Sequence, residues 1–325
     1  MVTMKDGACI PSAPVDGMLL SIRGKGLLHA RAMTIAGTDR RRAMAAGLGA
    51  VALWGALATL SVLAGPIPPF QMVAMTFAIA AAIGIGRARF RNMAWRDLFR
   101  WPGQVWLLGV GGLFGYHALY FAALQLAPPA EANLVNYLWP LLIVLLSAPL
   151  ARETLGWPHL LGAFLGFAGV ALLAFERGAN FAGAHLTGYL LALGCAFTWS
   201  LYSVLSRRFG ETPTDAIAAF CAAASVLSLI CHLLFETTVW PTTAPAWLAV
   251  VALGLGPAGT AFYLWDHAVK RGDIRALGAL SYAAPILSTA LLIVSGLAQP
   301  TSALLLAALL VTAGAVLASR EMWKR

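Results

Sequence analysis

The sequence predicts an all-α integral membrane protein with ten transmembrane helices, arranged as two inverted repeats of five helices. Long apolar runs, the placement of the cations between these runs, and a constant-offset match of the sequence to itself predict this fold class. Of 325 residues, 60% are hydrophobic and 11% are charged, whereas soluble globular chains carry about 25% charged residues. The composition therefore excludes an ordinary soluble domain and a disordered protein.

Ten apolar segments are long enough to cross a bilayer. A hydrocarbon core of about 30 Å requires roughly 20 helical residues. The predicted spans cover residues 43–64, 67–86, 103–125, 129–150, 157–175, 186–206, 214–235, 246–269, 274–297 and 302–319. These spans leave almost no room for a soluble domain.

The net charge of +9 reflects 22 Lys and Arg against 13 Asp and Glu. Cytoplasmic loops of membrane proteins are enriched in Lys and Arg. If the amino terminus is cytoplasmic, ten spans place every Lys and Arg on the cytoplasmic side except Arg177. The charge therefore predicts a topology with both termini inside, and it gives no support for a nucleic-acid partner.

The segment before the first span has no long apolar run, so residues 1–38 are expected to form a mobile cytoplasmic tail rather than a cleavable signal. The predicted domains are this tail, a first five-helix repeat at 39–180 and a second at 181–325. The four cysteines show no metal-ligand spacing. No metal, cofactor or catalytic residue is expected.

The two predicted repeats match without a gap at an offset of 145 residues. The matched pairs include Gly49 with Gly194, Trp54 with Trp199, Ser61 with Ser206, Tyr137 with Tyr282 and Pro140 with Pro285. Five spans per repeat is an odd number, so the second repeat must enter the membrane from the opposite face. Such inverted repeats build carriers that open a central site alternately to the two sides.

Polar and aromatic residues at mid-span predict where a substrate would bind. Trp54 and Trp199 lie roughly 15–20 Å below the surface, where an indole N–H needs a partner in protein or in a hydrated cavity. Pro140 frees a backbone carbonyl one turn back, which could accept from an ammonium group. The candidate substrate-binding residues are Trp54, Tyr116, His117, Asn136, Tyr137, Trp139, Trp199, Tyr202 and Tyr282, with Pro140 and Pro285 as gating or kink residues.

His117 is the only titratable acid or base predicted near the middle of a span. It could relay a proton, bind a substrate or simply donate to a nearby helix. Glu131 and Asp266 are expected at the membrane interfaces. The lack of a midplane carboxylate favours facilitated diffusion or exchange over tight ion coupling, and each aromatic residue could instead belong to a packing core.

Two glycine patterns have structural explanations. Gly254, Gly256 and Gly259 spell a dinucleotide-binding pattern, but they fall within a predicted span without a preceding strand. The four-residue spacings Gly111 to Gly115 and Gly162 to Gly166 favour close helix contacts.

Three short stretches carry a resemblance to a known family: Val135-Asn136-Tyr137-Leu138-Trp139-Pro140, Ala196-Phe197-Thr198-Trp199 and Ser281-Tyr282-Ala283-Ala284-Pro285. Over residues 40–325 the chain resembles the EamA-type carriers of the drug/metabolite transporter superfamily, and specifically the aromatic amino acid exporter branch. Glu153 matches the acidic residue that the family has after the fourth span. The resemblance implies a bacterial inner-membrane exporter of amino acids, aromatic ones included.

Other functions remain open from the sequence. A drug or cationic-metabolite exporter is the nearest alternative, and a membrane-embedded enzyme or lipid-handling protein is a more distant one. An enzyme would need convergent titratable groups at one depth, and the chain offers His117 alone at the midplane, so we expect no enzymatic activity. The expected partners are an amino acid or small metabolite and the lipid bilayer. The oligomeric state is open, and a monomer is compatible.

Overall fold

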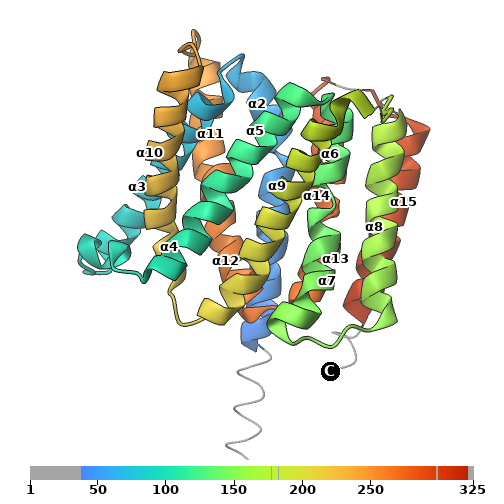
Figure 1. Ribbon diagram of the computed structural model, residues 1–325, viewed down its shortest axis with the longest axis horizontal. Coiled ribbons are helices and arrows are strands. Elements are labelled where there is room, and N and C mark those ends of the chain that lie inside the picture. Colours follow the sequence, from blue (N-terminus) through green and yellow to red (C-terminus); the bar gives the residue numbers. More distant parts are fainter. Residues whose placement is uncertain (1–37, 177, 182, 298, 321–325) are drawn as a thin grey trace, which may run out of the picture. The chain divides into compact units, whose positions relative to one another are not determined.

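The computed structural model describes residues 38–320 except 177, 182 and 298, so the predicted tail lies outside the described residues. All regular elements in this part of the chain are helical (Figure 1). Residues 38–55 are helical. The α-helices that follow are α2 (Leu57–Ala64), α3 (Pro69–Phe90), α4 (Gly103–Val110), α5 (Tyr116–Leu126), α6 (Pro129–Asn136), α7 (Trp139–Ala151), α8 (Trp157–Glu176), α9 (Leu186–Leu205), α10 (Ile217–Phe235), α11 (Ala244–Leu255), α12 (Ala261–Arg271), α13 (Ile274–Leu280), α14 (Ala283–Val294) and α15 (Ser302–Ser319).

Nine helical stretches in the described residues are long and apolar enough to cross a membrane, and they coincide with the first nine predicted spans. The predicted tenth span is also a helix, α15, but its apolar stretch, Ser302–Ala318, is shorter than the others. The prediction of an all-helical membrane protein is therefore confirmed.

Two of the spanning stretches are broken near their middle, as their prolines predict. Helix α6 ends at Asn136 and α7 begins at Trp139, followed at once by Pro140. In the same way α13 ends at Leu280 and α14 begins at Ala283, ahead of Pro285. A proline ring lacks an N–H and crowds the preceding turn, so a continuous helix cannot form there.

Two other spanning stretches contain a widened, π-helical turn. These turns are η2 (Gly111–Gly115), between α4 and α5, and η6 (Gly256–Thr260), between α11 and α12. Both contain five residues, and η6 follows η2 at the 145-residue offset of the sequence match. Such turns occur often at functional sites.

Glycines account for the close packing of α8 against α15. A Cβ at Gly162 would meet the carbonyl oxygen of Gly314, and a Cβ at Gly314 would meet that of Gly162. The predicted close helix contact at Gly162 is therefore confirmed. The same prediction for Gly111 and Gly115 is wrong. A Cβ at Gly111 would meet nothing within 4 Å, a Cβ at Gly115 would make only an ordinary contact of 3.8 Å with Thr198, and the two glycines are the first and last residues of η2.

Candidate functional site

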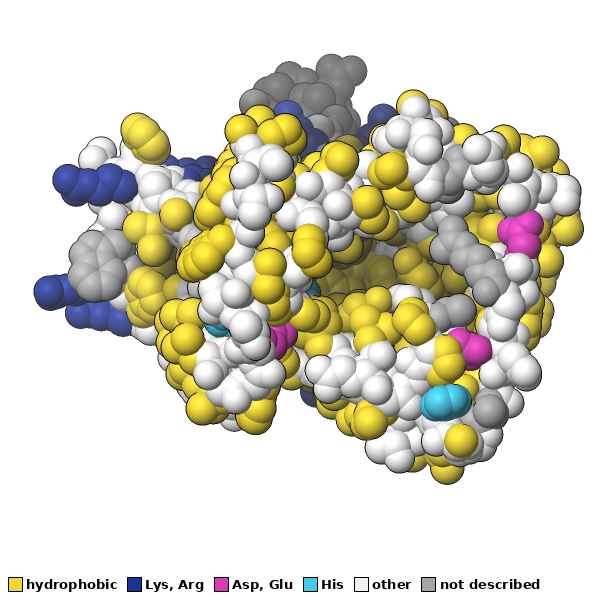
Figure 2. Space-filling model, turned by 90° about the horizontal axis from the view of Figure 1, so that it is seen from above, with side chains coloured by type: hydrophobic (Ala, Val, Ile, Leu, Met, Phe, Trp, Pro, Cys, Tyr) yellow, Lys and Arg dark blue, Asp and Glu magenta, His cyan; other side chains and the backbone are white. Residues whose placement is uncertain are grey.

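A cavity of about 770 Å³ enters the helical body from one end. Figure 2 looks onto this end and shows a hollow whose visible walls are mainly hydrophobic. The lining includes Gly65 and Ile67, between α2 and α3, and Pro129 at the start of α6. We call this the open end; it is the upper end in Figure 1. Its volume is within the range of about 300–1,000 Å³ that is usual for small-molecule sites.

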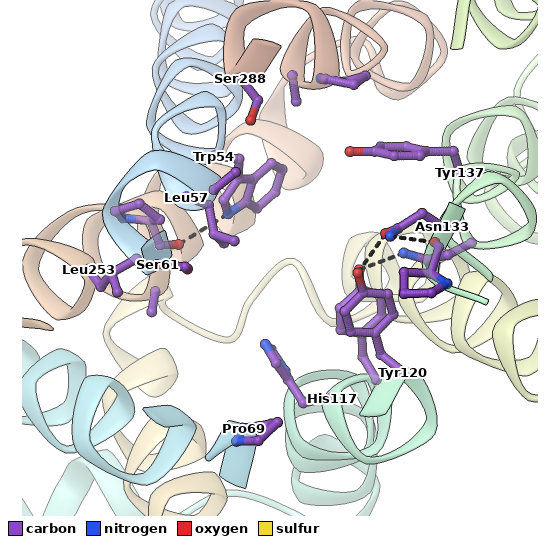
Figure 3. A pocket seen from close by; sticks show the side chains of 18 of the residues that line it. Trp54, Leu57, Ser61, Pro69, His117, Tyr120, Asn133, Tyr137, Leu253 and Ser288 are labelled. Atoms are coloured by element: carbon purple, nitrogen blue, oxygen red, sulfur yellow. Dashed lines mark hydrogen bonds between the residues drawn. The ribbon is translucent and has the colours of Figure 1, made fainter. Parts of the chain in front are cut away.

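One wall of the cavity is polar and comes from α5 and α6 (Figure 3). The Tyr120 hydroxyl donates to Oδ1 of Asn133 at 2.5 Å. The Asn133 amide in turn donates to the carbonyl of Pro129 at 2.8 Å. Deeper in this wall, Nδ2 of Asn136 donates to the Tyr116 hydroxyl at 3.0 Å. These bonds hold the polar groups in fixed orientations along one side of the cavity.

His117 points into the cavity from α5 (Figure 3). Its Nδ1 lies 2.7 Å from the carbonyl oxygen of Leu113, in η2. A carbonyl oxygen only accepts, so Nδ1 is the donor, and Nε2 of the neutral ring is left as an acceptor. The ring packs edge-on against Phe77, with 5.1 Å between centroids. The π-helical turn thus fixes both the orientation and the tautomer of this histidine.

Four tryptophans form a layer at the base of the cavity, which we call the tryptophan floor: Trp54, Trp139, Trp199 and Trp265. Every pair within this set is in ring contact, with centroid separations from 5.2 Å for Trp54 with Trp265 to 6.4 Å for Trp199 with Trp265. The first three line the cavity. Trp265 is fully buried, and its indole donates to Ser203 at 3.0 Å.

The indole N–H of Trp54 has a hydrogen-bond partner, as expected for a polar group in the middle of a membrane span. It donates to the carbonyl of Pro257, in η6, at 3.1 Å. This bond links the first helix of the chain to the second π-helical turn.

The cavity brings together most of the predicted substrate-binding residues, and it also contains residues that the sequence did not single out. Its lining includes Trp54, Tyr116, His117, Asn136, Tyr137, Trp139, Trp199 and Pro285. The additional lining residues include Ser61, Phe77, Asn133, Phe262 and Ser288. Trp265, beneath the cavity, was also missed, because it directly precedes the charged end of α12.

Three predicted residues lie outside the cavity lining. Tyr202 is 2% exposed and packs over Gly112. Tyr282 is fully buried against Gly166, a contact made possible by the missing glycine side chain. Pro140 shapes the break between α6 and α7 from behind the lining.

Two carboxylates predicted at the interfaces are buried, and both lie outside the cavity. Glu131 is 4% exposed and accepts the backbone N–H of Asn180 at 2.6 Å. Asp266 is 2% exposed and accepts from Lys270 and from Thr214, at 2.9 and 2.8 Å. Among the described lining residues, His117 is the only acid or base. The cavity therefore has one polar wall, a mainly apolar remainder that includes the hydroxyls of Ser61 and Ser288, and no fixed charge among its described lining residues.

The opposite end, which we call the closed end, is crossed by ion pairs. Glu153, between α7 and α8, pairs with Arg207 at 3.0 Å and approaches Arg275 at 3.9 Å. Arg207 also donates to the carbonyl oxygens of Val269 and Gly272. The two contacts of Glu153 join the first half of the chain to the second below the tryptophan floor.

The site geometry favours a small molecule with an aromatic or apolar part and neutral or zwitterionic polar groups. Aromatic rings stack on tryptophan, and an ammonium group is attracted to the ring faces by about 0.5–2 kcal/mol. A fixed net charge on the ligand would find no opposite charge among the described lining residues.

Comparison with known proteins places the chain among membrane transporters. The model of the EamA-like transporter family matches residues 41–175 and again residues 186–320. The chain is 52% identical over 283 residues to the aromatic amino acid exporter YddG of Ancylobacter novellus, covering 86% of this chain and 98% of that protein. It is 24% identical over 271 residues to YddG of Salmonella typhimurium, covering 77% and 87% of the two chains.

More distant similarity extends to other substrates. A biotin transporter of Escherichia coli is 24% identical over 225 residues, covering 67% of this chain and 73% of that protein. A solved crystal structure superposes on this chain with a TM-score of 0.84 at 50% identity, covering 88% of this chain and 99% of the other. The chain is thus a multi-pass membrane protein that belongs to the EamA-like transporter family.

Proposed function

We propose that this protein exports amino acids, aromatic ones included, across the bacterial inner membrane by alternating access. The observation that carries the proposal is the cavity, which combines a polar wall with an aromatic floor. Among its described lining residues, His117 is the only Asp, Glu, Lys, Arg or His, so the cavity carries no fixed charge. Its relatives in Ancylobacter novellus and Salmonella typhimurium are named aromatic amino acid exporters, which supports the same substrate class.

The residues of the site suit the two ends of an amino acid. The rings of Trp54, Trp139 and Trp199 offer faces for an indole or phenyl side chain. Nε2 of His117 and the amide of Asn133 offer hydrogen bonds to the ammonium and carboxylate groups. Because the floor makes largely non-directional contacts, smaller amino acids are also accommodated.

We further propose ten spans with both termini in the cytoplasm, α15 being the tenth. This topology places the cation-rich loops around Arg89, Arg152 and Arg207 at the closed end on the cytoplasmic side. The open end then faces the periplasm, so the described state is open to the outside.

The two halves, residues 39–180 and 181–325, are proposed to be inverted repeats. The offset of 145 residues relates the turns η2 and η6, and it also relates the breaks at Tyr137 and Tyr282. Two halves with matching hinges can open either end of one cavity at similar free energy, which alternating access requires.

Purified protein in liposomes tests the substrate class directly. We expect uptake of labelled tryptophan and threonine above that of empty vesicles, measured with and without a proton gradient. Absence of uptake of any amino acid would contradict the proposal.

A quaternary amine in the same panel tests the alternative of a cationic-metabolite exporter. The tryptophan floor favours this alternative, because aromatic faces also bind quaternary ammonium groups. Uptake of the amine without uptake of amino acids would support it.

A further inference from the structure

The hydrogen bond between Trp54 and Pro257 joins the two halves of the chain at the level of the tryptophan floor. Trp54 lies in the helix of residues 38–55, and Pro257 lies in the π-helical turn η6. The bond is therefore placed where a movement of α11 and α12 relative to the first helix would make or break it.

The 145-residue offset assigns this bond a counterpart. Trp54 corresponds to Trp199, and Pro257 corresponds to Gly112, in η2. The helix pairs concerned pack in the same way. A Cβ at Gly49 would lie 3.3 Å from Leu264, and at the matching positions a Cβ at Gly194 would lie 3.8 Å from Leu119. Trp199 thus lies on the helix that packs against η2 and α5, at the position that corresponds to Trp54.

The counterpart bond is not formed in the described state. Trp199 Nε1 has no hydrogen-bond partner among the described residues, although its ring lines the cavity and lies in the tryptophan floor. One of the two matched indoles is therefore bonded and the other is free.

The residues around Trp54 and around Trp199 also differ in their exposure to the cavity. Leu57, Ser61 and Pro257 line the cavity near the formed bond. Their matched residues are Tyr202, Ser206 and Gly112: Tyr202 and Ser206 are 2% and 3% exposed, and the Tyr202 ring packs over Gly112. The bond is thus present on the side that is open and absent on the side that is packed shut.

We propose that the two indoles act as an exchanging pair that sets which end of the cavity is open. In the state described here, Trp54 donates to Pro257 and the open end is accessible. In the opposite state, Trp199 donates to the carbonyl of Gly112, the Trp54 bond is broken, and the packed side around Ser206 opens. This inference rests on the proposed inverted repeats and alternating access, and it assigns Trp54 and Trp199 a positioning role besides any contact with substrate.

The proposal requires opposite effects from two chemically identical substitutions. Trp54→Phe removes a bond that exists only in the described state, so it shifts the population toward the other state. Trp199→Phe removes a bond that exists only in the other state, so it shifts the population toward the described one. Because a net hydrogen bond contributes about 0.5–1.5 kcal/mol, each shift should be between about twofold and tenfold.

The matched serines provide the measurement. Ser61→Cys reports the open end and Ser206→Cys reports the packed side, each introduced singly into the full chain with Cys9, Cys195, Cys221 and Cys231 replaced by Ala. The ratio of their labelling rates with a water-soluble maleimide, in detergent and without substrate, follows the ratio of the two states. We expect Trp54→Phe to raise the Ser206-to-Ser61 ratio by about two- to tenfold and Trp199→Phe to lower it by a similar factor.

Trp101→Phe is the matched control. It removes an indole hydrogen bond to the carbonyl oxygen of Leu98, which is local because the two residues are three positions apart in the chain. The proposal is overturned if Trp54→Phe and Trp199→Phe shift the ratio in the same direction, or if neither shifts it more than Trp101→Phe does. A loss of folded protein is monitored by gel filtration, and Trp→Leu variants, which also lack a hydrogen-bond donor, replace any variant that does not fold.

The labelling experiment needs no transported amino acid, so it separates the two levels of the argument. Opposite shifts in a protein that takes up no amino acid would uphold the indole exchange and contradict the proposed substrate. Normal amino acid uptake without opposite shifts would uphold the transport function and contradict the indole exchange.

Discussion

The two ends of the helical body are held together by different interactions. At the open end, carboxylates accept backbone N–H groups: Glu131 binds Asn180, and Glu236 binds Phe70 and Gln71 at the start of α3. At the closed end, arginine and lysine side chains pair with carboxylates of helices and of the segments between them. Backbone contacts keep a wall rigid while leaving the cavity entrance clear, whereas side-chain pairs can join elements that must later separate.

The closed end itself contains two kinds of ion pair. Arg275 with Asp273 and Lys270 with Asp266 are buried pairs within one helix or turn, at 2.9 Å each. The pair between Glu153 and Arg207 joins the two halves, and both side chains are 24% exposed. A buried pair within one element moves as a unit, whereas the more exposed pair of Glu153 with Arg207 is one of the contacts across the halves at this end, as is the approach of Arg275 to Glu153.

The first prediction tests the assignment of the two ends to the two sides of the membrane, and its expected effect is all or none. A cysteine at Ile67, at the open end, should react with an impermeant thiol reagent from outside intact cells. A cysteine at Arg89, in the cation-rich last turn of α3, should not react. Reaction of the Arg89 position alone would reverse the proposed topology.

The second prediction concerns the buried pair at the closed end. Arg275→Ala leaves the Asp273 carboxylate, whose side chain is 2% exposed, without its guanidinium partner. Removing one member of a buried pair costs about 3–5 kcal/mol, so we expect a clear loss of thermal stability in detergent. Arg100→Ala is the control, since its pair with Asp97 is exposed and should contribute less than about 1 kcal/mol. Equal losses in the two variants would contradict the distinction.

The third prediction concerns the tryptophan floor. Trp139→Ala should lower tryptophan uptake in liposomes by about tenfold or more, because it removes one face of the aromatic site, a contribution of about 0.5–2 kcal/mol for a ring face together with the lost apolar contact. The protein should still purify as a folded species on gel filtration. Unchanged uptake would make Trp139 a packing residue only.

The smallest effect is expected at the pair that joins the halves. Glu153→Gln removes the charge that binds Arg207 and should favour opening of the closed end. Since both side chains are partly exposed, the pair contributes at most about 1 kcal/mol, and labelling of a cysteine at Ser206 should rise by up to about fivefold. A fall in labelling would show that the pair does not hold this end shut.

Much of the fold could be predicted from the sequence, because a membrane span must be apolar over a fixed length and its backbone must be helical. The prolines Pro140 and Pro285 also located the helix breaks, since their effect on the backbone is local. The π-helical turns could not be predicted in this way. Gly111 and Gly115, the first and last residues of η2, have the spacing of a helix-contact pattern. Only the backbone geometry distinguishes a π-helical turn from such a contact.

The sequence predicted those site residues whose depth in the membrane determines their surroundings. It was wrong for residues that were chosen only because they match a residue of the other repeat. Trp54, Trp139 and Trp199 lie at mid-depth on helices that face the cavity. Tyr282 was chosen as the counterpart of Tyr137, yet only Tyr137 lines the cavity. Under the proposed inverted arrangement, matched residues away from the tryptophan floor face opposite ends, and only one end is open in the described state; Trp54 and Trp199 lie at the floor and both line the cavity. A sequence repeat therefore identifies pairs of positions without showing which member is exposed.

The most direct test of the central claim is trans-stimulation of tryptophan uptake. Liposomes containing the protein are loaded with unlabelled tryptophan or left empty, and the initial uptake of labelled tryptophan is compared. A carrier whose two ends open alternately should take up label faster into loaded vesicles, because a bound substrate accompanies the return step. Uptake that proceeds at the same rate in loaded and empty vesicles, and rises linearly with tryptophan concentration without saturating, would indicate a passage open at both ends and would contradict the account.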